Sequence, residues 1–276
     1  MEYSNILNQY APAATVEQVA EQVAAARAAQ AKNENSEVYK FCLSAVDLTT
    51  LTSNDSVESV TAFANRAVDF YKAYPEVDNV ASICVYPSFV ETVGLAVDGT
   101  PMRITSVAGG FPSSQTFLEV KMLEVAMAVE NGADDEAANE VEMIRSEMDE
   151  DVILKVILET GALKSPELIR NASLISMAAG ADFIKTSTGK IDVAATPEAA
   201  VVMCQAIKDY YDKTGRKVGF KAAGGVKTPQ DAALYYTIVE QILGEQWLTT
   251  DLFRIGASSA ANNLLSAIVG QKVAHF

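Results

Sequence analysis

The sequence predicts an α/β protein whose parallel sheet closes into a barrel, and three observations support this fold class. From about residue 40, short β-rich runs alternate with capped amphipathic helices, as in a parallel sheet with crossover helices. Several runs end in polar or charged residues, and a (β/α)8 barrel builds its site from such strand ends. An open doubly wound sheet would show the same alternation, but no dinucleotide-type glycine fingerprint follows the first run.

The predicted strands are apolar runs that are mostly bounded by Gly, Pro, Asp or Thr. Cap residues ahead of prolines, at Ser165, Thr196 and Thr228, mark the starts of three intervening helices. No linker or repeat divides the chain, so we predict one α/β-barrel domain over residues 1–276. The strands are expected at Phe41–Leu48, Val80–Tyr86, Arg103–Ala108, Val152–Leu158, Asp182–Thr186, Val218–Ala222 and Phe253–Ala257.

An N-terminal helical extension over residues 1–37 precedes the predicted barrel. Its segment Thr15–Ala31 has the pattern of an amphipathic helix. We expect this helix to cover the bottom of the barrel or to join an interface.

The charge and the ends of the chain exclude several classes of partner. A net charge of −15 disfavours nucleic acid and anionic membranes. The N-terminus has neither a basic segment followed by an apolar core nor a run long enough to span a bilayer, which predicts a cytoplasmic protein. An anionic substrate would therefore need a local cluster of donors.

Cysteine and histidine are too few and too scattered for most metal or triad chemistry. Cys42, Cys84 and Cys204 are widely spaced in apolar segments, which predicts buried free thiols. The one histidine, His275, is next to the C-terminus, where we expect a frayed tail. Lysine and carboxylate side chains are therefore expected to carry any catalysis, with no metal site.

The segment Ala181–Lys190 is the most informative part of the chain. It places Lys185 inside an apolar strand, where burial should lower the pKa of its amine and make the amine nucleophilic. The Thr-Ser-Thr-Gly run that follows supplies hydroxyls and a flexible backbone to approach an anion. Lys185 alone would equally fit a strand-end lysine that reaches solvent.

Two later segments also place a basic residue in an apolar strand that is followed by a possible anion-binding turn. Val218–Val226 places Lys221 in an apolar strand before Gly224 and Gly225, and in a barrel this strand would neighbour that of Lys185. Arg254–Ser259 leads from the last strand to the start of an apolar helix, where backbone N–H groups favour an anion. The combination predicts a phosphate site after the last strands.

These segments together closely resemble the deoxyribose-phosphate aldolase family, from residue 41 to residue 260. The most specific are Ala181–Lys190 and Val218–Val226. The others are Arg254–Ser259, Ile83–Pro87, Val46–Leu51 and Leu154–Thr160.

The resemblance implies a class I aldolase that reversibly cleaves 2-deoxy-D-ribose 5-phosphate to acetaldehyde and D-glyceraldehyde 3-phosphate without a cofactor. Lys185 matches the Schiff-base lysine and Lys221 the second lysine, which keeps Lys185 partly unprotonated. Asp47 and Lys155 match supporting groups at the mouth, and Cys84 matches a strand cysteine near the site. The phosphate and substrate positions fall on Thr188, Gly189, Lys190, Gly224, Gly225, Gly256, Ser258 and Ser259.

One region departs from the family pattern. The family continues its Gly-Ala-Asp turn into a fourth strand whose aspartate joins a proton relay, whereas here Asp134 and Asp135 lead into a helix-like acidic run. We therefore predict a (β/α)8 TIM barrel whose fourth strand is missing from the sequence. We favour an omitted segment over a genuine deletion, which would leave a seven-stranded or an open barrel. We assign the relay to neither aspartate and interpret both as charges at a helix N-terminus.

Other functions stay open at this point. Another Schiff-base barrel aldolase or a transaldolase would share the lysines, and a non-catalytic or impaired sugar-phosphate-binding homologue would share the phosphate loops. The expected partner is a small sugar phosphate, and we expect a homo-oligomer, specifically a dimer.

Overall fold

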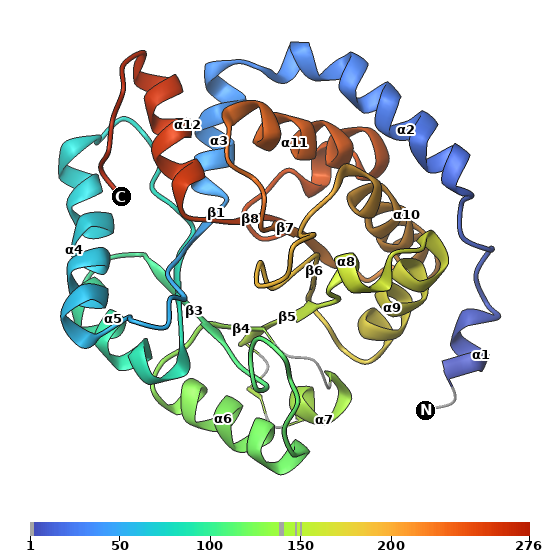
Figure 1. Ribbon diagram of the computed structural model, residues 1–276, viewed down its shortest axis with the longest axis horizontal. Helices are drawn as coiled ribbons and strands as arrows, with labels where there is room; N and C mark the ends of the chain where they lie inside the picture. The colour runs from blue at the N-terminus through green and yellow to red at the C-terminus, as the bar shows by residue number, and fades with distance from the viewer. Residues whose placement is uncertain (1–2, 138–140, 147, 150) are drawn as a thin grey trace.

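A computed structural model describes residues 3–137, 141–146, 148–149 and 151–276, with the backbone alone described for residues 3 and 135–137. Eight parallel strands pair in chain order, and the eighth pairs with the first, so the sheet is a closed barrel inside a ring of helices (Figure 1). The predicted TIM barrel is confirmed. The strands are β1 Val46–Thr49, β2 Ser82–Val85, β3 Arg103–Val107, β4 Asp135–Ala137, β5 Ile153–Ile157, β6 Phe183–Lys185, β7 Gly219–Ala223 and β8 Phe253–Ala257.

The prediction of a missing fourth strand is wrong. β4 is formed by Asp135–Ala137, and it pairs with β3 on one side and β5 on the other. Its acidic composition carries no strand signal, but both neighbouring strands offer backbone groups that must be paired, and this tertiary requirement overrides local propensity. The barrel therefore closes without any added segment.

Asp134, just before β4, was also misinterpreted. Its carboxylate accepts a hydrogen bond from the backbone N–H of Ile104 at 2.7 Å, so it fixes the start of β4 against β3 instead of charging a helix N-terminus. The next residues, 138–140, lie outside the described part of the chain.

Most helices of the ring lie between successive strands, and each long one buries an apolar stripe against the barrel. Thr196 and Thr228 cap their helices ahead of prolines as predicted, and so does Ser165. The helices are α1 Tyr3–Leu7, α2 Val16–Ala29, α3 Ser36–Ser44, α4 Val57–Ala73, α5 Val90–Val97, α6 Leu118–Glu130, α7 Val141–Ser146, α8 Thr160–Leu163, α9 Pro166–Ala178, α10 Pro197–Thr214, α11 Pro229–Leu243 and α12 Ser259–Val269.

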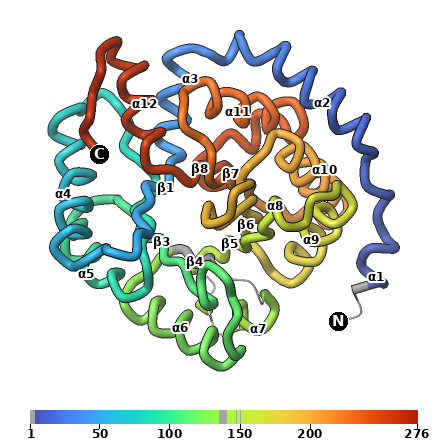
Figure 2. The backbone as a smooth tube through the Cα atoms, viewed as in Figure 1, coloured from blue at the N-terminus to red at the C-terminus, as the bar shows by residue number. Residues whose placement is uncertain are grey.

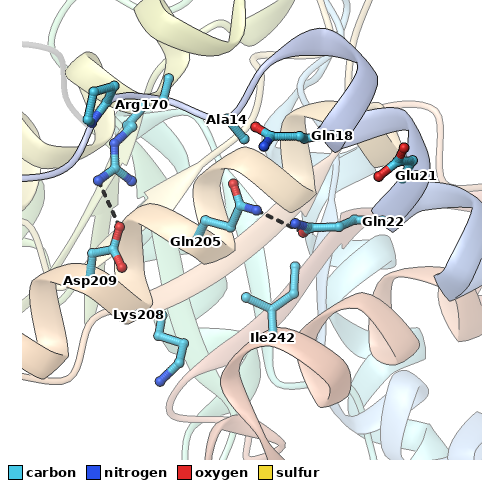
Figure 3. A pocket seen from close by; sticks show the side chains of 11 residues that line it. Ala14, Gln18, Glu21, Gln22, Arg170, Gln205, Lys208, Asp209 and Ile242 are labelled. Carbon is cyan, nitrogen blue, oxygen red and sulfur yellow. Dashed lines mark hydrogen bonds and ion pairs between the residues drawn. The ribbon is translucent and has the colours of Figure 1, made fainter.

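The N-terminal extension wraps the outside of the helix ring and does not cover the barrel bottom (Figures 1 and 2). The predicted helix is α2, which packs on α10 and α11. Figure 3 shows how the segment is held: Gln205 donates to Gln22 at 2.8 Å, and Arg170 pairs with Asp209 at 2.7 Å. Arg170 also donates to the backbone oxygen of Ala11 at 3.1 Å.

The first predicted strand and the predicted C-terminal tail differ most from the structure. The first apolar run begins as a helix, because Asn35 accepts hydrogen bonds from the N–H groups of Glu37 and Val38 and starts α3. The C-terminal tail is anchored instead of frayed, since Asn262 accepts hydrogen bonds from the N–H groups of His275 and Phe276.

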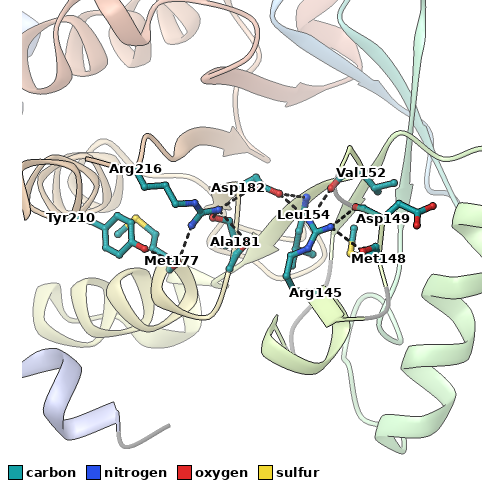
Figure 4. Close-up of polar contacts among 11 residues, drawn as sticks. Arg145, Met148, Asp149, Val152, Leu154, Met177, Ala181, Asp182, Tyr210 and Arg216 are labelled. Atoms are coloured by element: carbon teal, nitrogen blue, oxygen red, sulfur yellow. Dashed lines mark hydrogen bonds and ion pairs between the residues drawn. The ribbon is translucent and has the colours of Figure 1, made fainter. Parts of the chain in front are cut away.

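The bottom of the barrel is braced around Asp182, just before β6 (Figure 4). Its carboxylate pairs with Arg145 of α7 at 3.2 Å and with Arg216 at 2.8 Å, and it accepts from the N–H of Leu154 at 3.0 Å. Both arginines also donate to backbone carbonyl groups, among them those of Val152 and Ala181. This network ties short α7 to the starts of β5 and β6.

Within the described residues, no helix combines the length and the apolar character needed to cross a bilayer.

Candidate active site

Asp47, on β1, is the centre of a buried charge cluster inside the barrel. One carboxylate oxygen accepts from Arg254 of β8 at 2.6 Å and from the hydroxyl of Ser82 at 2.8 Å. The other oxygen pairs with Lys155 of β5 at 3.2 Å and with Lys221 of β7. Burial alone would raise the pKa of Asp47, but these three cations hold it well below its usual range. Asp47 is therefore a fixed anion that orients the cations around it.

Lys185, at the end of β6, has a different environment from the other two lysines. It is 4% exposed, and within the described residues it forms no ion pair with Asp47. Its Cα is in register with that of Lys221 on the adjacent strand. Burial, followed by the nearby positive charge of Lys221, lowers the pKa of Lys185 to about 7. Lys185 therefore supplies a neutral amine near neutral pH.

Two glycines leave the space that the buried lysines occupy. A Cβ at Gly256 would be 3.2 Å from Cε of Lys221, and a Cβ at Gly219 would be 2.3 Å from the ring of Phe183. That ring lies under Lys155, with the lysine nitrogen 5.5 Å from the ring centroid. Gly256, predicted as a substrate residue, thus also accommodates the side chain of Lys221.

A cavity of about 440 Å³ opens above Lys185 and contains every predicted phosphate position. Gly189 and Gly224 meet across it, since a Cβ at Gly224 would be 3.1 Å from Cα of Gly189. Both have positive φ (75° and 76°), which glycine adopts without steric cost. The predicted residues that line the cavity are Lys185, Thr188, Gly189, Lys190, Gly224, Gly225, Gly256, Ser258 and Ser259.

The start of α12 forms one end of this cavity. Ser258 precedes the helix and Ser259 is its first residue, so the unpaired N–H groups of the first turn are at the cavity wall. The side chain of Ser258 does not cap the helix. The helix dipole and the free N–H groups favour a phosphate at this end.

Four predicted residues are close to Lys185 without lining the cavity. Asp47, Lys155 and Lys221 form the buried cluster beneath it. Cys84 is buried in a small apolar group with Leu51 and Val107. All three cysteines are free and buried, as predicted, and burial raises the pKa values of Cys42 and Cys204.

Sequence reasoning missed the residue that holds the Thr188 loop. Glu159, after β5, accepts hydrogen bonds from both the N–H and the hydroxyl of Thr188. Its φ of 52° is left-handed, an uncommon conformation for a residue with a side chain. Arg254 and Ser82, which orient Asp47, were also missed as site residues. Each of these roles depends on a partner from another strand, which no local pattern reveals.

The loop after β1 forms the opposite wall of the cavity. Thr49–Thr52 and Phe63 line it, and Lys190 donates to the backbone oxygen of Leu51 across the mouth. Lys227 also lines the cavity; it is the third lysine there, after Lys185 and Lys190, and it was not predicted from the sequence.

Comparison with known proteins agrees with this geometry. Residues 135–260 match the model of the DeoC/LacD family aldolases. A Caenorhabditis elegans protein named as a deoxyribose-phosphate aldolase is 42% identical over 262 residues, with 87% of this chain and 84% of that protein covered. The chain belongs to the deoxyribose-phosphate aldolase family.

Further family members extend this comparison. The deoxyribose-phosphate aldolase of Mus musculus is 41% identical over 245 residues, covering 79% of this chain and 77% of that protein. A tetrameric deoxyribose phosphate aldolase from Aeropyrum pernix has the same fold, with a TM-score of 0.66 at 22% identity and with 92% and 98% of the two chains covered.

Proposed function

We propose that this family member reversibly cleaves 2-deoxy-D-ribose 5-phosphate to acetaldehyde and D-glyceraldehyde 3-phosphate through a Schiff base on Lys185. The observation that carries the proposal is a buried lysine with a pKa near 7 at the floor of a cavity whose far end suits a phosphate. The names of the relatives support the choice of substrate.

The proposed reaction begins when the neutral amine of Lys185 attacks the C1 aldehyde and water leaves, which gives an iminium ion. A base takes the proton of the C3 hydroxyl, and the C2–C3 bond breaks with its electron pair flowing to the iminium. Glyceraldehyde 3-phosphate leaves. The resulting enamine takes a proton at C2, and water hydrolyses the new iminium to release acetaldehyde and restore the amine.

In this proposal, the charge cluster serves Lys185 without forming the covalent bond. Burial and the positive charge of Lys221 keep the amine of Lys185 partly neutral, and Lys221 is a candidate for proton transfer, while Asp47 fixes the position of Lys221. Lys155 and Arg254 hold Asp47 from other strands. No metal or cofactor is needed for these steps.

The phosphate group is proposed to sit between the first turn of α12 and the glycine loops. Ser258 and Ser259 supply N–H groups, Gly189 and Gly224 allow a close backbone approach, and Lys190 can release Leu51 to reach the anion. These donors are local, which an anionic substrate requires on a protein of net charge −15.

Assembly and location are part of the proposal. We propose a cytoplasmic homodimer. Apolar side chains exposed at the start of α6 and along one side of it support self-association, and the tetramer of the Aeropyrum pernix relative is a precedent for assembly within this fold. These side chains are Phe117, Val120, Leu123 and Met127.

Substrate profiling tests the proposed activity. Purified protein should cleave deoxyribose 5-phosphate, with acetaldehyde and glyceraldehyde 3-phosphate formed in equal amounts, and should be inactive on ketose phosphates. Cleavage of ketose phosphates would instead indicate another Schiff-base aldolase or a transaldolase. Binding of deoxyribose 5-phosphate without turnover would indicate a non-catalytic homologue.

A further inference from the structure

A second cavity, of about 340 Å³, lies outside the barrel mouth, between α8, the starts of α9 and α10, and α2. Its walls are largely apolar and include Val19, Ile169, Val193, Ala199 and Val202. The exposed lysine and glutamate that also line it, Lys164 and Glu198, have opposite charges, so the cavity favours neither an anion nor a cation. A neutral, mainly apolar ligand fits this lining.

The same cavity is lined by Thr160, which has an unsatisfied polar group. Thr160 is 3% exposed, and its hydroxyl has no hydrogen-bond partner within the part of the chain that the structure describes. A buried hydroxyl without a partner is costly, and native proteins rarely retain one without a reason. A ligand with one hydroxyl or carbonyl oxygen could pair with it after a rotation about χ1 of Thr160.

One short segment connects this cavity to the phosphate end of the active site. Val193 lines the cavity and is packed on α8, because a Cβ added at Gly161 would be only 2.0 Å from the Val193 carbonyl oxygen. The methyl group of Ala194 is 2.6 Å from the Cβ position of Gly224, and the N–H of Ala195 donates to the Gly224 oxygen at 3.2 Å. Residues 193–195 thus touch the second cavity on one side and the phosphate loop on the other.

We propose that this cavity is a regulatory site for a neutral aromatic or alicyclic alcohol or carbonyl compound. A cavity of about 150 Å³ suffices for benzene, so 340 Å³ accommodates a ring with a short polar arm. The ligand packs its ring on Val193 and Val202 and places its oxygen toward Thr160.

Occupancy of the cavity is expected to tighten phosphate binding. Val193 is 51% exposed and belongs to a segment without regular secondary structure, so a bound ring would cover it and restrict its motion. The ordered segment 193–195 then holds Gly224 in place before the substrate binds. Binding of the substrate phosphate therefore costs less conformational entropy.

Ligand-observed NMR with benzyl alcohol tests the site, and steady-state kinetics test the coupling. Benzyl alcohol should bind the wild-type protein, and Ala199→Leu, which fills the cavity, should abolish binding. Ala24→Leu adds the same side chain at an exposed position of α2 and should retain binding. At saturation, benzyl alcohol should lower the KM for deoxyribose 5-phosphate about fivefold and leave that for unphosphorylated deoxyribose unchanged.

Several results would overturn this inference, which rests on the proposed function only for its kinetic part. Binding that survives Ala199→Leu, or no binding at millimolar benzyl alcohol, excludes the site. Binding with an unchanged or raised KM excludes the coupling. If Ala199→Leu does not fold, a crystal soaked with 4-bromobenzyl alcohol must show an anomalous bromine peak in the cavity, and a peak elsewhere excludes it. An inactive wild-type protein that still binds benzyl alcohol at this site contradicts only the proposed activity.

Discussion

Lys185, Lys155 and Lys221 are the same residue type, but their different surroundings give them different properties in this site. Lys155 and Lys221 share one carboxylate oxygen of Asp47, whereas Lys185, within the part of the chain that the structure describes, has no ion pair with Asp47 and is affected chiefly by the loss of water and by the charge of Lys221. Desolvation and a nearby cation both disfavour the protonated form. The same residue type therefore provides counter-charges to Asp47 at two positions and, at the third, an amine with a lowered pKa, for which we propose the role of nucleophile.

The pH dependence of turnover should follow the amine of Lys185. Its pKa is about 7, and only the neutral form attacks a carbonyl, so kcat/KM should fall as pH drops below about 7. Lys221→Met removes the nearby cation and should raise the pKa of Lys185, moving this acid limb upward by on the order of one pH unit. The measurement is a pH profile of kcat/KM for both proteins.

Lys217→Met is the matched control for this profile, because Lys217 lies over the ring of Trp247, away from the cluster. Its profile should match that of the wild-type protein. An acid limb that stays in place in Lys221→Met would show that Lys221 does not set the pKa of Lys185.

Glu159 should act on substrate binding through Thr188. Removing its carboxylate in Glu159→Ala releases the Thr188 loop, and a hydrogen bond to a charged group contributes about 1.5–3 kcal/mol. KM for deoxyribose 5-phosphate should rise at least about tenfold with little change in kcat, as steady-state kinetics would show. The control variant Glu167→Ala, on the exposed first turn of α9, should leave KM unchanged. If KM rose equally in Glu167→Ala and in Glu159→Ala, Glu159 would have no specific role in substrate binding.

The lysines could be predicted from sequence because a cation inside an apolar run is a local anomaly. The position of Lys185 in its strand, followed by a glycine loop, already indicated a buried amine beside an anion site. Glu159 and Arg254 stood out as polar strand-end residues that favour a barrel, but they were given no role in the site, because the partner of each comes from another strand. Ser82 escaped prediction for the same reason.

At the scale of elements, the cavity end that we propose for the phosphate combines a helix start with two strand-to-helix loops. The first turn of α12 provides N–H groups, and Gly189 and Gly224 bring their backbones together. Ser258→Asp would place a negative charge at this end. KM for deoxyribose 5-phosphate should rise by about two orders of magnitude, whereas KM for unphosphorylated deoxyribose should change little. Equal effects on both substrates, compared by steady-state kinetics, would argue against a phosphate at this position.

Helices and strands with a clear apolar or amphipathic pattern in their own sequence were predicted. Elements whose structure depends on contacts with adjacent elements were not. Seven strands stood out as apolar runs and α2 as an amphipathic helix. β4, at Asp135–Ala137, is a strand because β3 and β5 pair with it on both sides. Helix α3 was hidden because its buried face merges with the apolar run of β1, and only Asn35 marks its start.

At the scale of the whole molecule, the network around Asp182 stabilises the bottom of the barrel. Asp182→Asn weakens two ion pairs that are partly exposed, so the free energy of unfolding should drop by about 1–2 kcal/mol. The rate of catalysis should not change, because this network lies before the strands and the site after them. Chemical denaturation checks the first claim, with Asp212→Asn, which breaks the exposed pair with Lys208, as a control of about 0.5 kcal/mol or less. Equal losses in the two variants would contradict a bracing role for Asp182.

The central claim about the molecule is that Lys185 alone forms the covalent imine. Borohydride reduction in the presence of acetaldehyde, followed by peptide mapping, should place an ethyl group on Lys185 in the wild-type protein. Lys185→Leu should carry no such label, while Lys221→Met should still be labelled at Lys185 at a pH high enough to deprotonate it. A label mapped to Lys221 or Lys155, or undiminished labelling of Lys185→Leu, would contradict the account.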